Sequence, residues 1–262
     1  MNIDLSGKHA MVCGSTQGIG KAIAIELALL GADVTLVARD EKKLLQVKKE
    51  LPVKMGQKHD CIHADFFFPA ELQLKAERYI KQKGPVHILV NNTGGPPGGE
   101  ITQAKVEEFT KAFSSHLVCN HILVQSVLEG MKAEKYGRII NIISTSVKQP
   151  LKGLGVSNTI RAAVGNWAKT LSVELAPFGI TVNNVLPGAT NTARISTLLE
   201  TKSKKTGKQI KELEEEMLKE IPAGRFAEPS EVACAVAFLA SPAAAYINGI
   251  NVPVDGGRTA CL

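Results

Sequence analysis

Three glycines near the start of the chain have the spacing of a turn that could hold a phosphate group. Gly14, Gly18 and Gly20 follow the apolar run His9–Cys13 and precede a helical pattern. At such a junction, backbone N–H groups and the positive end of the helix dipole can approach a pyrophosphate. The spacing differs from the commoner G-x-G-x-x-G, and an ordinary tight turn also uses glycine. Taken alone, the turn leaves phosphate binding and a purely structural role about equally open.

The elements that would position this turn alternate along the chain. Short apolar runs alternate with helical patterns, and this order predicts a parallel α/β sheet with helices on both faces. Ile19, Ile23 and Leu27 recur at three- and four-residue steps before Gly31, which is placed to end a helix. We predict a doubly wound sheet of about seven strands. They are His9–Cys13, Val34–Ala38, Cys61–Ala64, Val86–Val90, Arg138–Ile143, Ile180–Asn183 and Asn251–Val254.

Two apolar stripes predict long helices between the later strands. Pro177 and Gly179 would end the second helix. The stripes are Phe113, Leu117, Val124, Leu128 and Met131 in the first helix, and Ile160, Val164, Trp167, Leu171 and Leu175 in the second.

The charged segment from about 194 to 220 interrupts the alternation, so we expect a helical flap there, over the strand ends and the substrate. A solvated helix face explains its lysines best, and the second interpretation is attraction of an acidic ligand such as a phosphorylated carrier. They are Lys202, Lys204, Lys205, Lys208 and Lys211. Without an internal repeat or a linker, residues 1–262 are expected to form a single dinucleotide-binding domain.

Composition narrows the class of protein. Hydrophobic residues make up 44% and charged residues 21%, which is the balance of a globular chain. The net charge of +6 is modest and only 5% of residues are aromatic, which argues against nucleic-acid binding. No apolar run is long enough to cross a membrane, and the first residues do not resemble a signal segment, so we expect a cytoplasmic location. No metal site is expected.

Further motifs stand in order along the chain. They are Gly14-x-x-x-Gly18-x-Gly20, Asn91-Asn92-Thr93-Gly94, Pro187-Gly188 followed by Thr190 and Thr192, Gly224–Ala233, and Val254-Asp255-Gly256-Gly257. Together they make the whole chain resemble the short-chain dehydrogenase/reductase family, and especially its branch of 3-oxoacyl-carrier-protein reductases. This resemblance implies a Rossmann-type fold and a dinucleotide cofactor.

The resemblance also implies which residues hold the cofactor. Asp65 would accept a hydrogen bond from the adenine amine. Thr93 departs from the alanine usual at its position, and Cys13 departs from a usual threonine. The residues that would line the pyrophosphate are Gly14, Ser15, Gln17, Gly18, Ile19 and Gly20. Those that would flank the adenosine ribose are Asn91, Thr93 and Gly94. Those that would contact the nicotinamide end are Pro187, Gly188 and Thr190.

Arg39, which follows the second strand, decides the cofactor prediction. Members that prefer NAD place an acidic residue there, whereas this chain has Ala38 and then Arg39. A guanidinium can hold a 2′-phosphate through paired, charge-assisted hydrogen bonds. We therefore predict NADP(H) rather than NAD. The alternative is that Arg39 caps a surface turn together with Asp40.

The catalytic positions depart most from the family. The family uses a tyrosine for proton transfer, a lysine four residues later, a serine that holds the substrate oxygen and an asparagine that maintains a water relay. Matching positions here are Ser157, Arg161, Ser144 and His116, so only the serine is retained. A serine hydroxyl is a poor proton donor, and a guanidinium does not exchange protons near neutral pH.

His116 is the one residue of the four with an ordinary pKa near neutrality, which makes it a candidate proton relay. The alternative, which we favour, is a structural histidine that fills the asparagine position. Lys148 and Lys152, between Ser144 and Ser157, are other candidate acids, although solvated loop lysines are the simpler interpretation.

Three functions fit these residues. The leading hypothesis is an NADP-dependent oxidoreductase that transfers a hydride to or from a carbonyl or alcohol group of a small-molecule or acyl-carrier-linked substrate. In it, Ser144 holds the oxygen and Arg161 is a cationic anchor. The second is a catalytically degenerate nucleotide-binding or regulatory protein, and the third is a non-redox isomerase or lyase. The family resemblance implies a homo-oligomer, a tetramer or a dimer.

Overall fold

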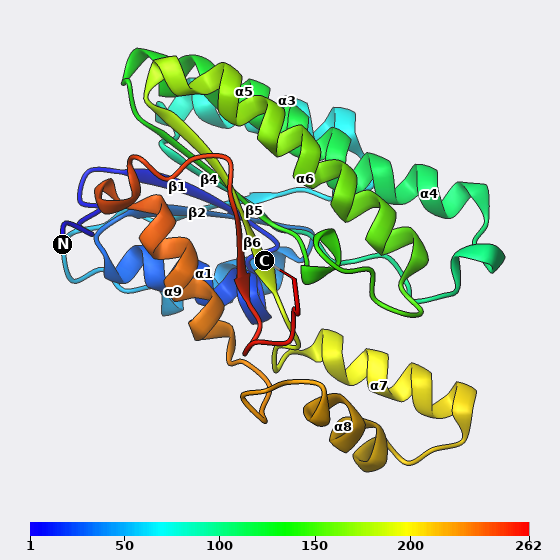
Figure 1. The fold of residues 1–262 in the computed structure, drawn as a ribbon. Helices are drawn as coiled ribbons and strands as arrows, with labels where there is room; N and C mark the ends of the chain where they lie inside the picture. The colour runs from blue at the N-terminus through cyan, green and yellow to red at the C-terminus, as the bar shows by residue number, and fades with distance from the viewer. Residues whose placement is uncertain (262) are drawn as a thin grey trace.

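The computed structural model describes residues 1–261, and it is built on one parallel sheet of seven strands (Figure 1). The strand order, β3-β2-β1-β4-β5-β6-β7, is that of a doubly wound sheet, so the predicted fold class is confirmed. The strands are β1 (His9–Cys13), β2 (Asp33–Ala38), β3 (Asp60–His63), β4 (Ile88–Asn91), β5 (Gly137–Ile142), β6 (Ile180–Pro187) and β7 (Asn251–Val254). All seven predicted strands are present, and β6 continues four residues past its predicted end.

Helices cover both faces of the sheet, as Figure 1 shows, because its buried strands are apolar on both sides. The face that carries α1 packs α1 against α9, with α2 alongside. The opposite face packs α3 against α5, with α4 and α6. The helices are α1 (Gly18–Leu29), α2 (Glu41–Glu50), α3 (Pro69–Lys83), α4 (Val106–Phe113), α5 (Cys119–Ala133), α6 (Gly155–Leu175) and α9 (Pro229–Ala240). Short 3₁₀ turns span Ile101–Gln103, Thr145–Val147, Ala176–Phe178 and Pro242–Ala244.

A row of asparagines joins the last four strands of the sheet. Asn91 donates to Asn141 at 2.9 Å, Asn141 donates to Asn184 at 2.9 Å, and Asn184 donates to Asn251 at 2.8 Å. The row exists because these residues are direct partners in the register of neighbouring strands. It begins in a fully buried strand and ends on the exposed Asn251. The amide chain therefore fixes the relative register of the strands that bear the site.

A π turn, Ser114–Val118, separates α4 from α5, where the sequence predicts one continuous apolar stripe. The extra residue in a π turn rotates the side chains on its two sides relative to each other. Phe113 is therefore 44% exposed rather than buried, which corrects the predicted stripe. His116, within the π turn, is turned inward and is only 2% exposed. The second predicted stripe lies on α6 as expected, and Gly179 follows with φ +73°.

The segment predicted as a flap forms two helices, α7 (Ala193–Thr206) and α8 (Ile210–Lys219), which extend beyond the end of β6 (Figure 1). Lys202 and Lys208 form ion pairs with Glu216 on the partner helix. This arrangement supports the solvated-face interpretation of the lysine cluster. In the described part of the chain, no helix is long and apolar enough to cross a membrane.

Candidate functional site

The turn after β1 packs directly on the turn after β4, where the strand order of the sheet reverses. Gly14 has φ +58°, and a Cβ there would lie 2.6 Å from the Asn92 carbonyl oxygen. A Cβ on Gly20 would lie only 2.1 Å from the carbonyl oxygen of Gly14. Asn92 holds the contact by donating from Nδ2 to the carbonyl of Cys13 at 3.2 Å. Both glycines are thus required for the two turns to pack closely at the point where the strand order reverses, which is where ligands bind in sheets of this type.

The same turn leaves polar groups without protein partners. The N-cap residue of α1, Gln17, makes no side-chain capping bond, so N–H groups at the start of this helix remain available. The hydroxyl of Ser15 is fully buried and has no hydrogen-bond partner within residues 1–261. An orphaned buried hydroxyl beside a helix N-terminus suits a bound oxyanion. The residues present therefore fit the pyrophosphate of a dinucleotide.

Arg39 leaves the carboxyl end of β2 with an exposed side chain. Among the described residues it forms no ion pair with Asp40, whose carboxylate instead caps α2 by accepting from the Lys43 N–H at 3.0 Å. The alternative in which Arg39 and Asp40 cap a turn together is therefore not what the structure shows. The guanidinium is available to a 2′-phosphate.

The other predicted cofactor residues follow the strands at the same edge. Asp65 follows β3, and its Oδ1 accepts from the Phe67 N–H at 3.0 Å, which leaves Oδ2 available. Thr190 follows β6 and donates to the Gly188 carbonyl at 3.2 Å. Asn91 differs from these residues, because its side chain is buried within the asparagine row of the sheet.

Ser144 and Arg161 are brought together although they lie on different elements. Ser144 caps the 3₁₀ turn after β5, and its Oγ accepts from the Ser146 N–H at 3.1 Å. Arg161, one turn beyond Ser157 on α6, is 8% exposed and donates from Nη1 to the Ile142 carbonyl at 2.9 Å. Because Ile142 is the last residue of β5 and Ser144 follows two residues later, the guanidinium and the serine both lie at the carboxyl end of this strand. Ser157 is 9% exposed on the same helix.

His116 is hydrogen-bonded to Thr93, which also departs from the family motif. Its Nδ1 lies 2.5 Å from Oγ1 of Thr93. Burial, followed by the positive charges of Arg161 and Arg194, lowers the pKa of His116 to about 2. The imidazole is therefore neutral at physiological pH. These contacts support the structural interpretation of this histidine, and the relay role stays a prediction.

None of the three tyrosines of the chain lies at this edge of the sheet. Tyr136 precedes β5, at the opposite end of that strand, and donates to the Ala240 carbonyl at 2.8 Å. Tyr79 is on α3 and shares a hydrogen bond with Thr35, while Tyr246 is fully exposed after α9. No tyrosine elsewhere in the chain therefore replaces the one that the catalytic motif lacks.

Arg194, at the start of α7, is a site residue that sequence reasoning missed. It donates from Nη2 to the Pro96 carbonyl at 2.6 Å, in the loop after β4. The guanidinium groups of Arg194 and Arg161 both lie beside Gly95, and burial together with the charge of Arg194 lowers the pKa of Arg161 to about 10. The available signal was a cation two residues after Thr192, at the end of the Pro187-Gly188 motif.

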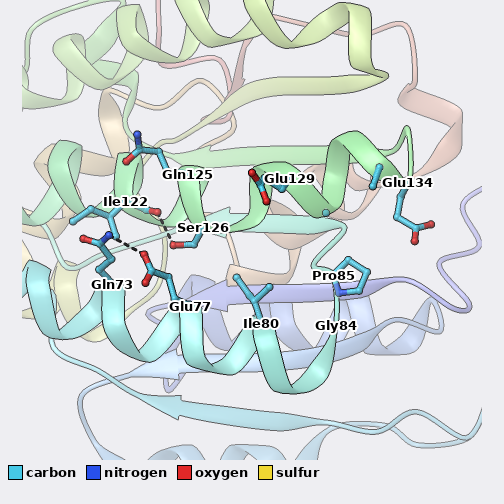
Figure 2. Close-up of a pocket in the computed structure, with 12 residues that line it drawn as sticks. Gln73, Glu77, Ile80, Gly84, Pro85, Ile122, Gln125, Ser126, Glu129 and Glu134 are labelled. Atoms are coloured by element: carbon cyan, nitrogen blue, oxygen red, sulfur yellow. Dashed lines mark hydrogen bonds between the residues drawn. The ribbon is translucent and has the colours of Figure 1, made fainter.

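A separate groove of about 550 Å³ lies between α3 and α5 (Figure 2). Gln73 and Glu77 line one side and are hydrogen-bonded to each other at 2.8 Å, and Gln125 lies across the groove on α5. Gly84 and Pro85, which precede β4, line one end. None of the predicted cofactor or catalytic residues lines it, so this groove is distinct from the site at the strand ends.

The sheet, the glycine turn and the polar groups at the carboxyl ends define a nucleotide-binding protein of the Rossmann type. Residues 14–259 match a family model described as enoyl-(acyl carrier protein) reductase. The chain is 34% identical to a 3-oxoacyl-[acyl-carrier-protein] reductase of Vibrio cholerae, covering 97% of this chain and 98% of that protein. It is 31% identical to an NADPH-dependent reductase of Bacillus subtilis, with coverage of 97% and 98%.

A solved structure of a reductase also resembles this protein over its whole length. The L-sorbose reductase of Gluconobacter frateurii, complexed with NADPH and L-sorbose, superposes with a TM-score of 0.93 at 32% identity, covering 100% of both chains. The protein therefore belongs to the short-chain dehydrogenase/reductase family, as the motifs predicted.

Proposed function

We propose that the protein is an oxidoreductase that uses NADP(H) to transfer a hydride to or from a carbonyl or alcohol substrate. The observation that carries this proposal is the combination at one sheet edge of an anion-binding turn, including the unpartnered Ser15 hydroxyl, with Ser144 and Arg161. The predicted cofactor is confirmed by the relatives, since one is described as NADPH-dependent and another was solved with NADPH. When bound, NADP(H) supplies or accepts the hydride.

The residues of the chain would stabilise the charge that the reaction creates. Hydride addition to a carbonyl places negative charge on its oxygen, and a preorganised donor and a cation stabilise that charge. Ser144 provides the hydroxyl and Arg161 the cation. We propose that Ser157 takes only the position of the tyrosine, and that Arg161 keeps the position and the charge of the lysine. Neither residue exchanges protons near neutral pH.

The proton that reaches the substrate oxygen must come by another route. We propose that water supplies it. A relay through His116 would have to run through the neutral imidazole, taking a proton at one ring nitrogen and releasing one at the other, because its pKa is lowered to about 2.

The test is oxidation of NADPH with a panel of ketones, oxo acids and acyl thioesters. We expect turnover of at least one substrate class, and we expect Ser144→Ala to lower kcat by about 100-fold. Ser230→Ala, an exposed serine at the start of α9, is the matched control and should leave the rate unchanged. NADPH binding with no turnover by any substrate would contradict the proposal.

A second candidate, a nucleotide-binding protein without catalysis, is favoured by the missing tyrosine together with the neutral, buried His116. If Ser157→Tyr with Arg161→Lys created ketone reduction where the natural chain has none, this candidate would be supported. Robust turnover by the natural chain would eliminate it. An isomerase or lyase would need an acid or base at the site, and the lowered pKa of His116 disfavours that role for the imidazole.

We also propose that the protein assembles as a homo-oligomer, a dimer or tetramer. Three exposed apolar side chains support this: Phe113 on α4, Val173 on α6 and Phe178 in the 3₁₀ turn that follows α6. Light scattering on the purified protein tests it, and a monomer mass would overturn it. A cytoplasmic location stays a prediction.

A further inference from the structure

Two guanidinium groups converge beside Gly95, in the loop after β4. Measured from the position that a Cβ on Gly95 would occupy, Nη2 of Arg194 lies at 3.5 Å and Nη2 of Arg161 at 3.7 Å. The loop is held against the start of α6, because Gly99 donates to the Gly153 carbonyl at 2.8 Å and accepts from the Gly155 N–H at 3.1 Å. One small group placed beside Gly95 could therefore contact both arginines.

Neither arginine has an anionic partner in the described chain. The arginine ion pairs within residues 1–261 are those of Arg225 and Arg258. Arg161 donates one hydrogen bond, to the Ile142 carbonyl, and Arg194 donates one, to the Pro96 carbonyl. Since a guanidinium has five N–H donors, most of the donors of both groups remain available.

This arrangement is costly in the absence of a ligand. Arg161 is 8% exposed, and a buried cation without a counter-ion loses its hydration without compensation. A second positive charge nearby adds repulsion. Arg161 is buried and Arg194 is exposed at the same carboxyl edge of the sheet, and like charges that gather at such an edge are a feature of ligand sites.

We propose that Arg161 and Arg194 form an anion subsite that takes the carboxylate of a small oxo acid, next to the carbonyl group held by Ser144. This inference rests on the proposed function. A planar guanidinium matches the two oxygens of a carboxylate. Arg161 is bonded to Ile142, the last residue of β5, and Ser144 follows two residues later, so a carboxylate held by the arginines and a carbonyl held by Ser144 would both lie at the end of this strand. A 2-oxo or 3-oxo acid carries both groups, whereas a substrate linked to a carrier as a thioester lacks the free carboxylate.

The phosphates of the cofactor have other partners. The pyrophosphate belongs with the turn at Gly14 to Gly20, and the 2′-phosphate belongs with Arg39. Arg194 nevertheless lies two residues after Thr192, whose Cγ2 is 3.1 Å from the position of a Cβ on Gly18. A contact from Arg194 to the pyrophosphate is therefore the competing explanation, and the experiment must separate the two anions.

The experiment is calorimetric titration of the full chain, saturated with NADP⁺, with oxamate, which places a carbonyl beside a carboxylate but cannot be reduced like a ketone. Its neutral methyl ester and inorganic phosphate are titrated in parallel. We expect oxamate to bind at least about tenfold more tightly than the ester and the phosphate. Arg194→Met should raise the Kd of oxamate at least about tenfold. Arg78→Met, which removes an exposed arginine from α3, is the charge-matched control and should leave it unchanged.

Three outcomes would overturn the subsite. They are equal binding of oxamate and its ester, equal oxamate binding by the natural chain and Arg194→Met, and a loss of NADPH affinity in Arg194→Met as large as the loss of oxamate affinity. Oxamate binding needs no turnover, so it separates this inference from the proposed function. Specific oxamate binding with no turnover of any substrate in the panel supports the subsite and contradicts the function, whereas turnover of neutral ketones without oxamate binding does the reverse.

Discussion

Oγ1 of Thr93 lies 2.5 Å from Nδ1 of His116, and this hydrogen bond joins the two positions at which the chain departs from its family in the loop after β4 and the helix behind it. The family has alanine and asparagine at these positions. The hydroxyl of Thr93 gives the buried imidazole a partner that alanine could not supply. The two departures therefore form one structural feature. The main role of Thr93 is to pair with His116, rather than to contact the cofactor.

A double-mutant cycle tests this pairing. Thr93→Ala leaves a buried imidazole nitrogen unpaired and should lower the free energy of unfolding by about 1 to 3 kcal/mol. In a His116→Asn background, Thr93→Ala should lower the free energy of unfolding by at least about 0.5 kcal/mol less, because the Thr93–His116 pair is already absent. Urea unfolding of the four proteins measures this. Strictly additive effects would show that the contact contributes nothing.

The lowered pKa of His116 makes stability depend on pH. The unfolded chain takes up a proton near the ordinary pKa of 6.5, whereas the folded imidazole stays neutral down to about 2. The free energy of unfolding therefore falls as the pH drops below 6.5, with a slope of up to about 1.4 kcal/mol per pH unit from this group. His116→Asn should remove that part of the slope. Urea unfolding from pH 7 to pH 5 gives both slopes, and identical slopes would contradict the assignment.

Ser15→Ala should affect binding and stability in opposite directions. The buried hydroxyl has no protein partner, so its removal should leave the ligand-free protein as stable or more stable, by up to about 1 kcal/mol. NADPH affinity should fall, because the hydroxyl is placed to donate to the pyrophosphate. Thermal unfolding with and without NADPH measures both effects. Unchanged NADPH affinity would show that Ser15 does not contact the cofactor.

Arg39→Ala should change cofactor selectivity. Loss of the charge-assisted contact to the 2′-phosphate should raise the Kd of NADPH by about 10- to 100-fold and leave that of NADH nearly unchanged. Lys42→Ala removes a neighbouring exposed cation from α2 and is the matched control. Equal weakening of NADPH and NADH in Arg39→Ala would mean that the guanidinium does not recognise the phosphate.

The asparagine row should respond differently at its middle and at its end. Asn141→Ala leaves the side-chain NH₂ group of Asn91 and the side-chain oxygen of Asn184 unpaired in a buried sheet. It should lower the free energy of unfolding by about 2 to 4 kcal/mol. Asn251→Ala, at the exposed end, should cost less than about 1 kcal/mol. Urea unfolding compares them, and equal losses would show that the row acts only through local packing.

The strands and the glycine turn could be predicted because their signals are local. An apolar run such as His9–Cys13 is buried on both faces whatever its neighbours are, and Gly14 and Gly20 stand where backbone atoms leave no room for a Cβ. Ser144 and Arg161 were found through the same motif matching. Their placement at the same end of β5 then follows from one hydrogen bond, from Arg161 to Ile142.

The other features of the fold and the site depend on three-dimensional geometry that a sequence pattern does not contain. A helical stripe is read with steps of three and four residues, so the five-residue step at Ser114–Val118 was missed and Phe113 was wrongly assigned to the core. The meeting of Arg161 with Arg194 depends on the path of the loop through Gly95 and on where α7 begins. The partners in the asparagine row are set by strand register, which no single strand reveals.

The π turn also has a consequence for insertions and deletions. The stretch from Val106 to Ala133 contains one residue more than a continuous α-helix between the same two ends would need. Loss of a single residue there would restore regular helix and rotate His116 away from Thr93, with every side chain of the site still encoded. Chain length at this point, as much as residue identity, determines whether the imidazole is enclosed.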